Sequence, residues 1–457
     1  MRSRFSRPLA FLALLEYGLL LTIFGISLYR LEGHFALPDD IGMSIFRLAL
    51  VSLTVQAMMY ALGLYTWRVG ASVFDVLLRF FAAFILGFAA YGFIVLLVSF
   101  LGLPPIVLVK AVFASIPVML VLRYAFMRLT DSVHTKSHVL VLGAGDKAAH
   151  LEALAQRGRE TRFRIKGFIP MEDKDLAVES AKVTRMPENL GQYVVDNSVD
   201  EVVVALEERR GTLPLEKLID ARLNGAKVTE YQSFCEQAEG HIDLKALRPS
   251  WFFESAGFRS GALHQVMKRS IDIGLSLILL VFTLPLLILT AIAVKLDSPG
   301  AVFYTQERVG LGGRPFTLIK FRSMRNDAEQ SNAPQWARKQ DARVTRVGRV
   351  IRKTRIDEIP QIFNVLRGDM SFVGPRPERP FFVTQLAQQI PFYQERHRVR
   401  PGITGWAQLN YPYGASEEDA RKKLEYDLYY IKHFSIIFDL SIALQTVRVI
   451  LWADGAR

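Results

Sequence analysis

Long apolar segments are the feature that most limits what this chain can fold into. Four such runs precede residue 130, at 9–29, 41–65, 76–100 and 104–126. At about 1.5 Å rise per residue, a helix of that length crosses the roughly 30 Å hydrocarbon core of a bilayer. The chain is 51% hydrophobic, and the excess lies in these runs. The sequence therefore predicts a four-helix transmembrane region over residues 1–130 and excludes a wholly soluble protein.

Charges beside these runs predict their orientation. The N-terminus carries Arg2, Arg4 and Arg7, the first loop is acidic, and basic residues follow the fourth run. Because basic loops stay on the cytoplasmic side, we expect the N-terminus and everything after residue 130 in the cytoplasm. The first run lacks a small-residue cleavage site, so we interpret it as a retained anchor rather than a signal peptide.

Short β-branched runs alternate with polar helical stretches over residues 137–235. Strands are expected at 138–142, 164–169, 199–206 and 226–230, which predicts a Rossmann-like α/β domain with a parallel sheet. The first strand ends in Gly143-Ala144-Gly145, with Ala148 where a dinucleotide-binding loop has its third small residue. An acidic ribose ligand about 20 residues on is not evident. We therefore interpret residues 143–145 as a tight strand-to-helix turn rather than a nucleotide-binding loop. After this domain we expect a linker over residues 236–265.

A fifth apolar run, at 273–294, is also long enough to span. Basic residues flank both ends, so the charge rule gives it no direction. Pro285 lies within the run, where it removes a helical hydrogen bond and forces a kink. A helix broken there could enter the bilayer and return to the same face, although a kinked full crossing stays open on these grounds.

Charge and cysteine content narrow the function classes. The net charge is +12, which suits anionic lipid, nucleotide phosphates or nucleic acid. Cys235 is the only cysteine, so the chain has no intrachain disulfide, and we expect no cysteine-based zinc site. No nucleic-acid recognition motif accompanies the basic residues, and we expect no nucleic-acid partner.

Adjacent carboxylates follow in a basic segment, where Asp357 and Glu358 lie within Thr354-Arg355-Ile356-Asp357-Glu358-Ile359-Pro360-Gln361. Neighbouring carboxylates point in different directions, so one could be a nucleophile or base while the other binds a hard metal such as Mg²⁺. Taken alone, the pair is better explained as a solvated, charged helix start, because such pairs are common on protein surfaces.

The surrounding motifs favour chemistry. Lys320-Phe321-Arg322-Ser323-Met324 precedes the pair, and the stretches 368–378 (G-D-M-S-F-V-G-P-R-P-E) and 400–408 (R-P-G-I-T-G-W-A-Q) follow it. Gly- and Pro-rich loops expose backbone N–H groups, and an arginine between two prolines is held in a fixed pose. Both features suit phosphate oxygens. A hydrophobic re-entrant element beside them suggests that one phosphorylated substrate is a lipid.

Together these motifs resemble the bacterial sugar transferases, also called polyprenyl-phosphate hexose-1-phosphate transferases or large monotopic phosphoglycosyl transferases. The resemblance covers about residues 267–452. It implies a C-terminal α/β-type catalytic domain over residues 266–457, with a re-entrant, Pro-broken membrane helix over 268–295. The four spans and the α/β domain are similar to those of larger members that prime exopolysaccharide synthesis, with an exosortase-associated subgroup as one option.

The resemblance also implies a reaction at the cytoplasmic face of a bacterial inner membrane. Asp357 would attack the sugar-linked phosphorus of a UDP-sugar, release UMP and pass the sugar phosphate to undecaprenyl phosphate. Glu358 would assist catalysis and bind Mg²⁺. The residues implied in substrate binding are Lys320, Arg322, Arg376 and Asp439. The expected partners are therefore these two substrates and membrane lipid. Whether the protein also forms a homo-oligomer stays open.

One loop departs from the family pattern. Many relatives have a basic residue just after W-A-Q-x-N, where this chain has Tyr411-Pro412-Tyr413-Gly414. These aromatics could stack on a sugar or base, or pack the loop, so the sugar stays open. A nucleotide-sugar dehydratase is excluded because no tyrosine has a lysine four residues on. A non-catalytic membrane scaffold that binds anionic lipid stays as the alternative.

Overall fold

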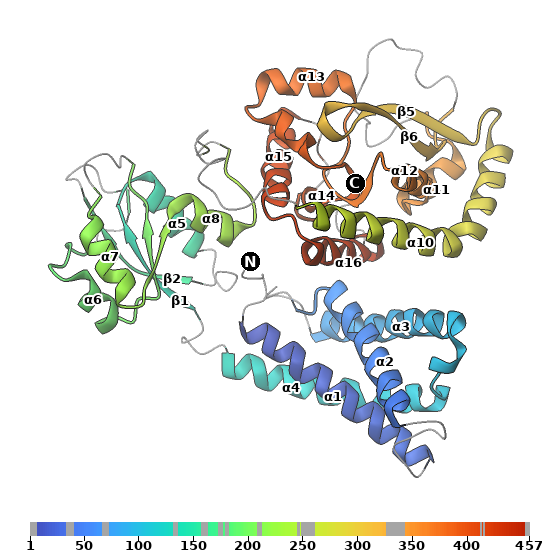
Figure 1. The fold of residues 1–457 in the computed structure, drawn as a ribbon, viewed down its shortest axis with the longest axis horizontal. Coiled ribbons are helices and arrows are strands. Elements are labelled where there is room, and N and C mark those ends of the chain that lie inside the picture. The colour runs from blue at the N-terminus through green and yellow to red at the C-terminus, as the bar shows by residue number, and fades with distance from the viewer. Residues whose placement is uncertain are drawn as a thin grey trace. The chain divides into compact units, whose positions relative to one another are not determined.

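The computed structural model describes residues 7–32, 41–65, 73–130, 136–156, 163–171, 177–178, 182–207, 213–244, 247, 261–325, 343–411, 414 and 416–452 (Figure 1). The chain consists of two compact units, Met1–Gly240 and His241–Arg457, and each is described by itself. Arg2 and Arg4 of the basic N-terminus, and Pro412 and Tyr413 of the aromatic loop, lie outside the described residues.

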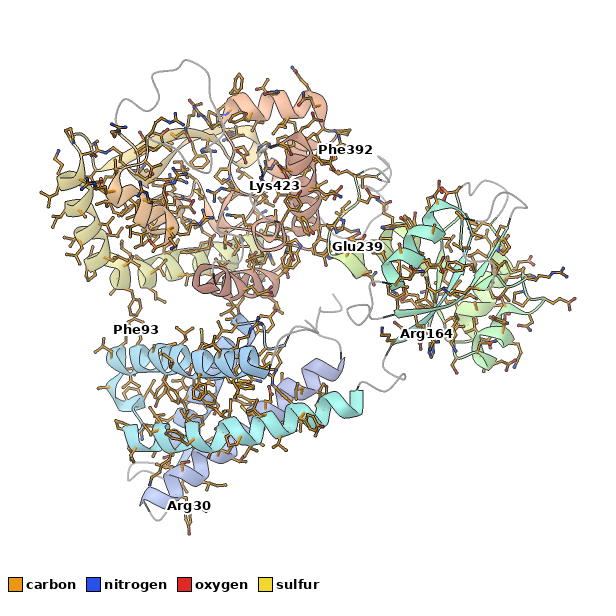
Figure 2. All side chains as sticks on the ribbon, turned by 180° about the vertical axis from the view of Figure 1, so that it is seen from behind. Arg30, Phe93, Arg164, Glu239, Phe392 and Lys423 are labelled. Atoms are coloured by element: carbon orange, nitrogen blue, oxygen red, sulfur yellow. The ribbon has the colours of Figure 1, made fainter. Side chains whose placement is uncertain are left out.

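Four apolar helices begin the first unit, and they coincide with the four predicted runs. They are α1 (Arg7–Glu32), α2 (Ile41–Ala61), α3 (Val73–Leu97) and α4 (Pro105–Thr130), with a short 3₁₀ turn, η1 (Ser99–Leu101), before α4. Each is long and apolar enough to cross a membrane. Helix α2 packs against α3, and α1 packs against α4. The side chains drawn on these helices are mostly carbon (Figure 2).

A buried ion pair joins α1 to α4. The guanidinium of Arg123 donates to the carboxylate of Glu16 over 2.6 Å, and Glu16 is fully buried. Arg123 also donates to the carbonyl of Leu64, and the Tyr65 hydroxyl donates to Glu16. Because an unpaired charge is costly in an apolar bundle, this pairing neutralises Glu16 and fixes the two helices together.

The rest of the first unit is a four-stranded parallel sheet with helices on both faces, as the alternating pattern predicts. The strand order is β2-β1-β3-β4. Val139 and Val141 face one core, while Leu140 and Leu142 face the other, so both sides of the sheet are covered. The strands are β1 (Ser137–Leu142), β2 (Phe163–Ile169), β3 (Glu201–Val204) and β4 (Lys227–Glu230), and the helices are α5 (Asp146–Gln156), α6 (Leu190–Asp196), α7 (Leu215–Leu223) and α8 (Tyr231–Glu239).

The glycine turn after β1 serves close packing. Gly143 has φ +124°, and a Cβ there would lie 2.5 Å from the carbonyl oxygen of Ala205. The carboxylate of Glu207 accepts from the backbone N–H of Lys147 in the first turn of α5, over 3.0 Å. A side chain of the protein thus provides the negative charge that this helix N-terminus favours. This supports the interpretation of a tight strand-to-helix turn.

The first helix described in the second unit is the long apolar helix α10 (Ala262–Asp297), and a hairpin, a short parallel pair and further helices follow it (Figure 1). Its strands are β5 (Phe303–Val309), β6 (Pro315–Phe321), β7 (Ser371–Val373) and β8 (Gly402–Thr404), and its helices are α11 (Arg346–Lys353), α12 (Gln361–Arg367), α13 (Pro380–Gln389), α14 (Trp406–Asn410), α15 (Glu417–Lys432) and α16 (Ile436–Trp452). Short 3₁₀ turns are η5 (Leu311–Gly313), η6 (Ile356–Glu358) and η7 (Tyr393–Arg398).

Helix α10 is continuous through Pro285, so the predicted break is a bend within one helix. Figure 1 shows α10 changing direction sharply along its length. A proline removes one helical hydrogen bond and clashes with the preceding turn, which accounts for a bend without ending the helix. Many of its large apolar side chains are exposed, among them Leu277, Val281, Leu284, Leu289 and Ile292.

Candidate active site

The two adjacent carboxylates lie on η6, a single tight turn between α11 and α12. Arg355, just before this turn, has φ +59° and ψ 14°, a left-handed conformation that is unusual for a residue with a side chain. The reversal ends α11 and turns Asp357 and Glu358 inward, where each is only 9% exposed. Left-handed residues of this kind cluster at functional sites, which makes the turn a candidate.

Asn364 of α12 fixes this turn against strand β6. Its side-chain amide donates to the carbonyl of Thr317 over 2.7 Å and accepts from the N–H of Ile319 over 3.0 Å. Asn364 is fully buried, so both bonds are shielded from water. The next residue of β6 is Lys320, which is thereby positioned opposite Glu358.

Three cations surround one oxygen of Glu358. Its Oε1 atom lies 2.7 Å from Nη2 of Arg376, 3.2 Å from Nζ of Lys320 and 3.6 Å from Nη1 of Arg355. Burial alone would raise the pKa of Glu358, but these charges outweigh it and hold that pKa well below its usual range. Glu358 is therefore ionised across physiological pH.

Asp357 differs from its neighbour. Burial raises its pKa, and the adjacent charge of Glu358 raises it further, although Lys320, Arg355 and Arg376 oppose both effects. Its Oδ1 atom is buried and accepts no hydrogen bond from any residue in the described part of the chain. A buried carboxylate oxygen with an open lone pair and a raised pKa is suited to nucleophilic attack or to a bound cation.

Arg376 is held by a second, deeper ion pair. Arg396 donates to the backbone carbonyl of Arg376 over 3.0 Å and to the carboxylate of Asp427 over 2.8 Å. Arg396 and Asp427 are both buried, at 6% and 1% exposure. The Pro375-Arg376-Pro377 segment thus has a fixed support behind it, while its guanidinium donates to Glu358.

A small cavity opens beside the carboxylates. Arg308, Lys320 and Arg376 contribute positive charge to its wall, while Glu358 balances only part of that charge. Such a surplus of cations in a partly buried recess suits phosphate oxygens. The lining residues are Arg308, Leu318, Lys320, Gln361, Arg376, Pro377 and Gly402.

The two other predicted substrate-binding residues make contacts with α10. Arg322 donates to the carbonyls of Ser298, over 2.6 Å, and Pro299, over 2.9 Å, so it caps the C-terminal end of α10. Asp439 pairs with Lys268 of α10 over 2.6 Å. The structure brings Lys320 and Arg376 together with the carboxylates, whereas Arg322 and Asp439 hold the two halves of α10.

Helix α10 also contacts both helices that flank η6. Near its start, Arg269 donates to the carbonyls of Val365 and Leu366 at the C-terminal end of α12. At its end, Asp297 accepts from the N–H of Val347 in the first turn of α11, over 3.0 Å. The apolar helix therefore clamps the α11-η6-α12 segment from both sides, and a movement of α10 would reach the carboxylate pair.

Sequence reasoning missed four of these residues. The left-handed backbone of Arg355 and the roles of Asn364, Arg396 and Asp427 depend on contacts between distant segments or on backbone angles. Arg396 and Asp427 lie 31 positions apart, and neither stands in a glycine- or proline-rich loop. The one available signal was that Asp427 falls inside the apolar pattern of a helix, where a charge needs a partner.

The fold and site define a class of protein: a membrane-associated protein in which a buried carboxylate pair adjoins a cationic recess. The family model for bacterial sugar transferases matches residues 263–453. This chain belongs to the bacterial sugar transferase family.

Three relatives show how the similarity is distributed. A UDP-N-acetylgalactosamine-undecaprenyl-phosphate N-acetylgalactosaminephosphotransferase of Aeromonas hydrophila is 52% identical over 43% of this chain and 46% of its own length. A UDP-glucose:undecaprenyl-phosphate glucose-1-phosphate transferase of Xanthomonas campestris pv. campestris is 38% identical over 58% of this chain and 56% of its own. The uncharacterized sugar transferase EpsL of Bacillus subtilis (strain 168) is 40% identical over 42% of this chain and 91% of its own. The chain thus spans about half the length of the first two relatives.

Proposed function

We propose that this protein transfers a hexose 1-phosphate from a UDP-sugar to undecaprenyl phosphate, giving undecaprenyl-diphosphate-sugar and UMP, as the first step of exopolysaccharide synthesis. One observation carries the proposal: Asp357 has an oxygen with an open lone pair, next to a carboxylate that gathers three cations. The names of the relatives support the substrate classes, since they act on UDP-sugars and undecaprenyl phosphate.

Two successive displacements at one phosphorus describe the reaction. The carboxylate of Asp357 attacks the sugar-linked phosphorus, the bond from that phosphorus to the bridging oxygen breaks, and UMP leaves with that oxygen. A phosphate oxygen of undecaprenyl phosphate then attacks the aspartyl phosphosugar, and the bond from phosphorus to the Asp357 oxygen breaks. Atoms and charge balance, and the carboxylate is regenerated. Lys320 and Arg376 bind the phosphate oxygens on which negative charge accumulates.

A magnesium ion fits the donors in this recess. Mg²⁺ uses one or two carboxylates together with substrate phosphates and water, and two buried carboxylates are present. Glu358 would hold the ion, although its Oε1 atom already faces three cations. When bound, the ion would supply further positive charge for the diphosphate.

We place α1 to α4 across a bacterial inner membrane, with the second unit on the cytoplasmic side and α10 entering and leaving at that same face. Several observations support this topology. Both halves of α10 bond to one compact unit, through Lys268 and Arg269 at one end and Asp297 at the other. The bend and the exposed apolar side chains between these anchors suit a helix that dips into lipid.

The test uses full-length protein in detergent with Mg²⁺, undecaprenyl phosphate and a panel of UDP-sugars that includes UDP-glucose and UDP-N-acetylgalactosamine. UMP release is scored for wild type, Asp357→Asn and a matched control, Glu307→Gln, which removes an exposed carboxylate from β5. We expect UMP from wild type and from the control, and loss of UMP in Asp357→Asn and in EDTA.

The intermediate is tested without the lipid acceptor. Wild type should release about one UMP per chain in a burst and gain the mass of a sugar phosphate, which hydroxylamine removes. If Asp357→Asn still gives the burst, another group is the nucleophile. If no UDP-sugar gives UMP while the lipid is active with another transferase, the membrane-scaffold alternative replaces the enzyme.

A further inference from the structure

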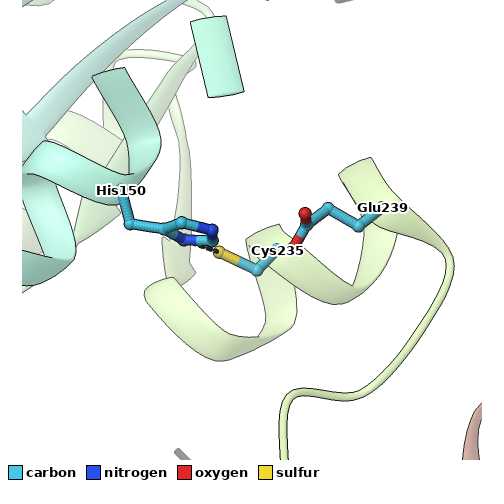
Figure 3. A group of neighbouring side chains, drawn as sticks. All are labelled: His150, Cys235 and Glu239. Carbon is cyan, nitrogen blue, oxygen red and sulfur yellow. Dashed lines mark hydrogen bonds between the residues drawn. The ribbon is translucent and has the colours of Figure 1, made fainter. Parts of the chain in front are cut away.

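A histidine, a cysteine and a glutamate converge in the α/β part of the first unit, far along the chain from the carboxylate pair. His150 comes from α5, and Cys235 and Glu239 come from α8 (Figure 3). Their ligand atoms, one from each side chain, all lie within 4.8 Å of one another. Nδ1 of His150 lies 3.9 Å from Sγ of Cys235. Within the described part of the chain, this is the one group of three such side chains.

Local helix geometry explains the convergence. Tyr231, Cys235 and Glu239 are spaced four residues apart, so they share one face of α8. That face turns toward α5 because Tyr231 and Cys235 belong to the same core cluster as the apolar side of α5. Cys235 is buried, while His150 and Glu239 are half-buried at the rim of this core. The three side chains thus lie at the edge of the core, and two of them are partly accessible to solvent.

The single cysteine predicts no cysteine-based zinc site, but His150 and Glu239 place two further ligands beside it. We propose that His150, Cys235 and Glu239 bind one divalent cation of the zinc class. Thiolate, imidazole and carboxylate are the ligands that zinc uses, and the thiolate disfavours Mg²⁺ and Ca²⁺. Tetrahedral Zn–N and Zn–S bonds place the two ligand atoms about 3.6 Å apart. The observed 3.9 Å needs only a small side-chain adjustment.

Tyr231 lies at the edge of this cluster. Its hydroxyl lies 2.8 Å from Nδ1 of His150, and the two rings meet edge to face. A cation bound at Nδ1 would displace that hydrogen bond, and a water beside the Tyr231 hydroxyl would complete the four ligands of the cation.

A bound cation would fasten α8 to α5. Helix α8 is the last element of the first unit, which ends at Gly240. Since Cys235 and Glu239 lie in the final turns of this helix, the metal would stop its C-terminal end from fraying. We therefore expect the ion to stabilise the α/β domain, with no part in sugar transfer.

The experiment uses full-length protein in detergent, purified without a histidine tag, stripped with EDTA and titrated with Co²⁺. Cys235 is the only cysteine in the chain, so any thiolate-to-cobalt charge-transfer band must come from it. We expect one Co²⁺ per chain, a band that Zn²⁺ abolishes and excess Mg²⁺ does not, and a higher thermal midpoint with Zn²⁺. The band should vanish in Cys235→Ser.

Three further variants decide the ligand set. Co²⁺ affinity should fall at least about tenfold in His150→Gln and in Glu239→Gln, since outer or inner ligand loss has effects of this size. It should stay unchanged in Glu216→Gln, an exposed glutamate on α7 of the same domain. If Cys235→Ser fails to fold, these three variants and the Zn²⁺-dependent midpoint still test the site.

Absence of the band in wild type, or a band of unchanged affinity in His150→Gln, would overturn the proposal. Binding that survives in Cys235→Ser with full affinity would do the same. None of these measurements involves UMP release, so failure of the metal site leaves the proposed transferase activity untouched, and failure of that activity leaves the metal site standing.

Discussion

Two buried charge clusters lie side by side in the second unit and differ in their balance. Arg396 and Asp427 form one pair with matched charges. Around Glu358, by contrast, three cations meet two carboxylates, and one oxygen of Asp357 stays open. A matched pair has satisfied its own charges, so it serves as a support. A cluster with surplus positive charge and an open oxygen has capacity for an anionic substrate, and this difference separates the site from its scaffold.

Removing the open oxygen's charge should have the largest effect. Asp357→Asn keeps the shape of the side chain and removes the proposed nucleophile, so UMP release should fall by about 10⁴-fold or more. Steady-state UMP assays measure this against Glu307→Gln, which should retain full activity. Activity of Asp357→Asn within tenfold of wild type would erase the distinction between the two clusters.

Breaking the ion pair between Arg396 and Asp427 should lower the stability of the fold. Asp427→Asn leaves Arg396 buried without its counter-charge, which should lower the free energy of unfolding by about 3–5 kcal/mol. Denaturant unfolding in detergent measures the change. The control, Glu395→Gln, removes the half-buried partner of the exposed Arg398 and should cost less than about 1 kcal/mol. Equal costs for the two variants would show that the deep pair is no support.

Replacing Arg376, one of the three cations around Glu358, should have an effect of intermediate size. Arg376→Lys keeps the charge and loses the planar fork that bonds two phosphate oxygens, so kcat/KM should fall by about 10²-fold. Arg379→Lys, three residues on in the same loop, is the matched control and should change little. A drop in unfolding free energy without a kinetic defect would place Arg376 with the scaffold.

The pH profile sharpens the contrast within the carboxylate pair. Burial raises the pKa of Asp357, and the reacting form is ionised, so UMP release should decline about tenfold per pH unit below that raised pKa. Glu358 stays ionised in this range because its pKa is held low. Burial also lowers the pKa of Lys320. As the pH rises, Lys320 should therefore lose its charge below the ordinary lysine range, and UMP release should decline there a second time. A rate that holds down to the ordinary aspartate range would contradict this assignment.

The smallest effect concerns an exposed carboxylate. Glu207→Gln removes the negative charge at the N-terminus of α5 and should cost about 0.3–1 kcal/mol of unfolding free energy. Thermal unfolding of the full chain measures it, with Glu216→Gln as the control. A loss as large as that of Asp427→Asn would mean that Glu207 does more than satisfy a helix end.

Periodicity was enough to predict most of the first unit. A short β-branched run identified the strand at 138–142, and run length alone identified α1 to α4. That both faces of this strand are buried is seen only in the structure. The predicted strand at 199–206 is shorter in the structure, ending at Val204, because pattern does not report where pairing stops. Pro285 indicated a break, and the result is a bend within a continuous helix whose two halves are anchored on the same unit.

The site was predictable only where its residues stand in a local motif. Asp357 and Glu358 are adjacent, Arg376 lies between two prolines and Lys320 begins the K-F-R-S-M motif; these four residues lie together. Arg322 follows the last residue of β6, so the alternation of the strand does not fix its direction, and its guanidinium turns to α10. Asn364, Arg396 and Asp427 act through partners that are 20 or more residues away, and no local pattern reveals such pairings.

The anchoring of α10 at both ends has a consequence for how the acceptor is found. With α10 in the bilayer surface as proposed, the protein and the polyprenyl chain diffuse in the same two-dimensional sheet. The second displacement should then follow the mole fraction of acceptor among the surrounding amphiphiles, whereas the first should follow the bulk concentration of nucleotide-sugar. Adding inert lipid would slow one half of the cycle and leave the other unchanged, so surface dilution can separate two steps that share a single carboxylate.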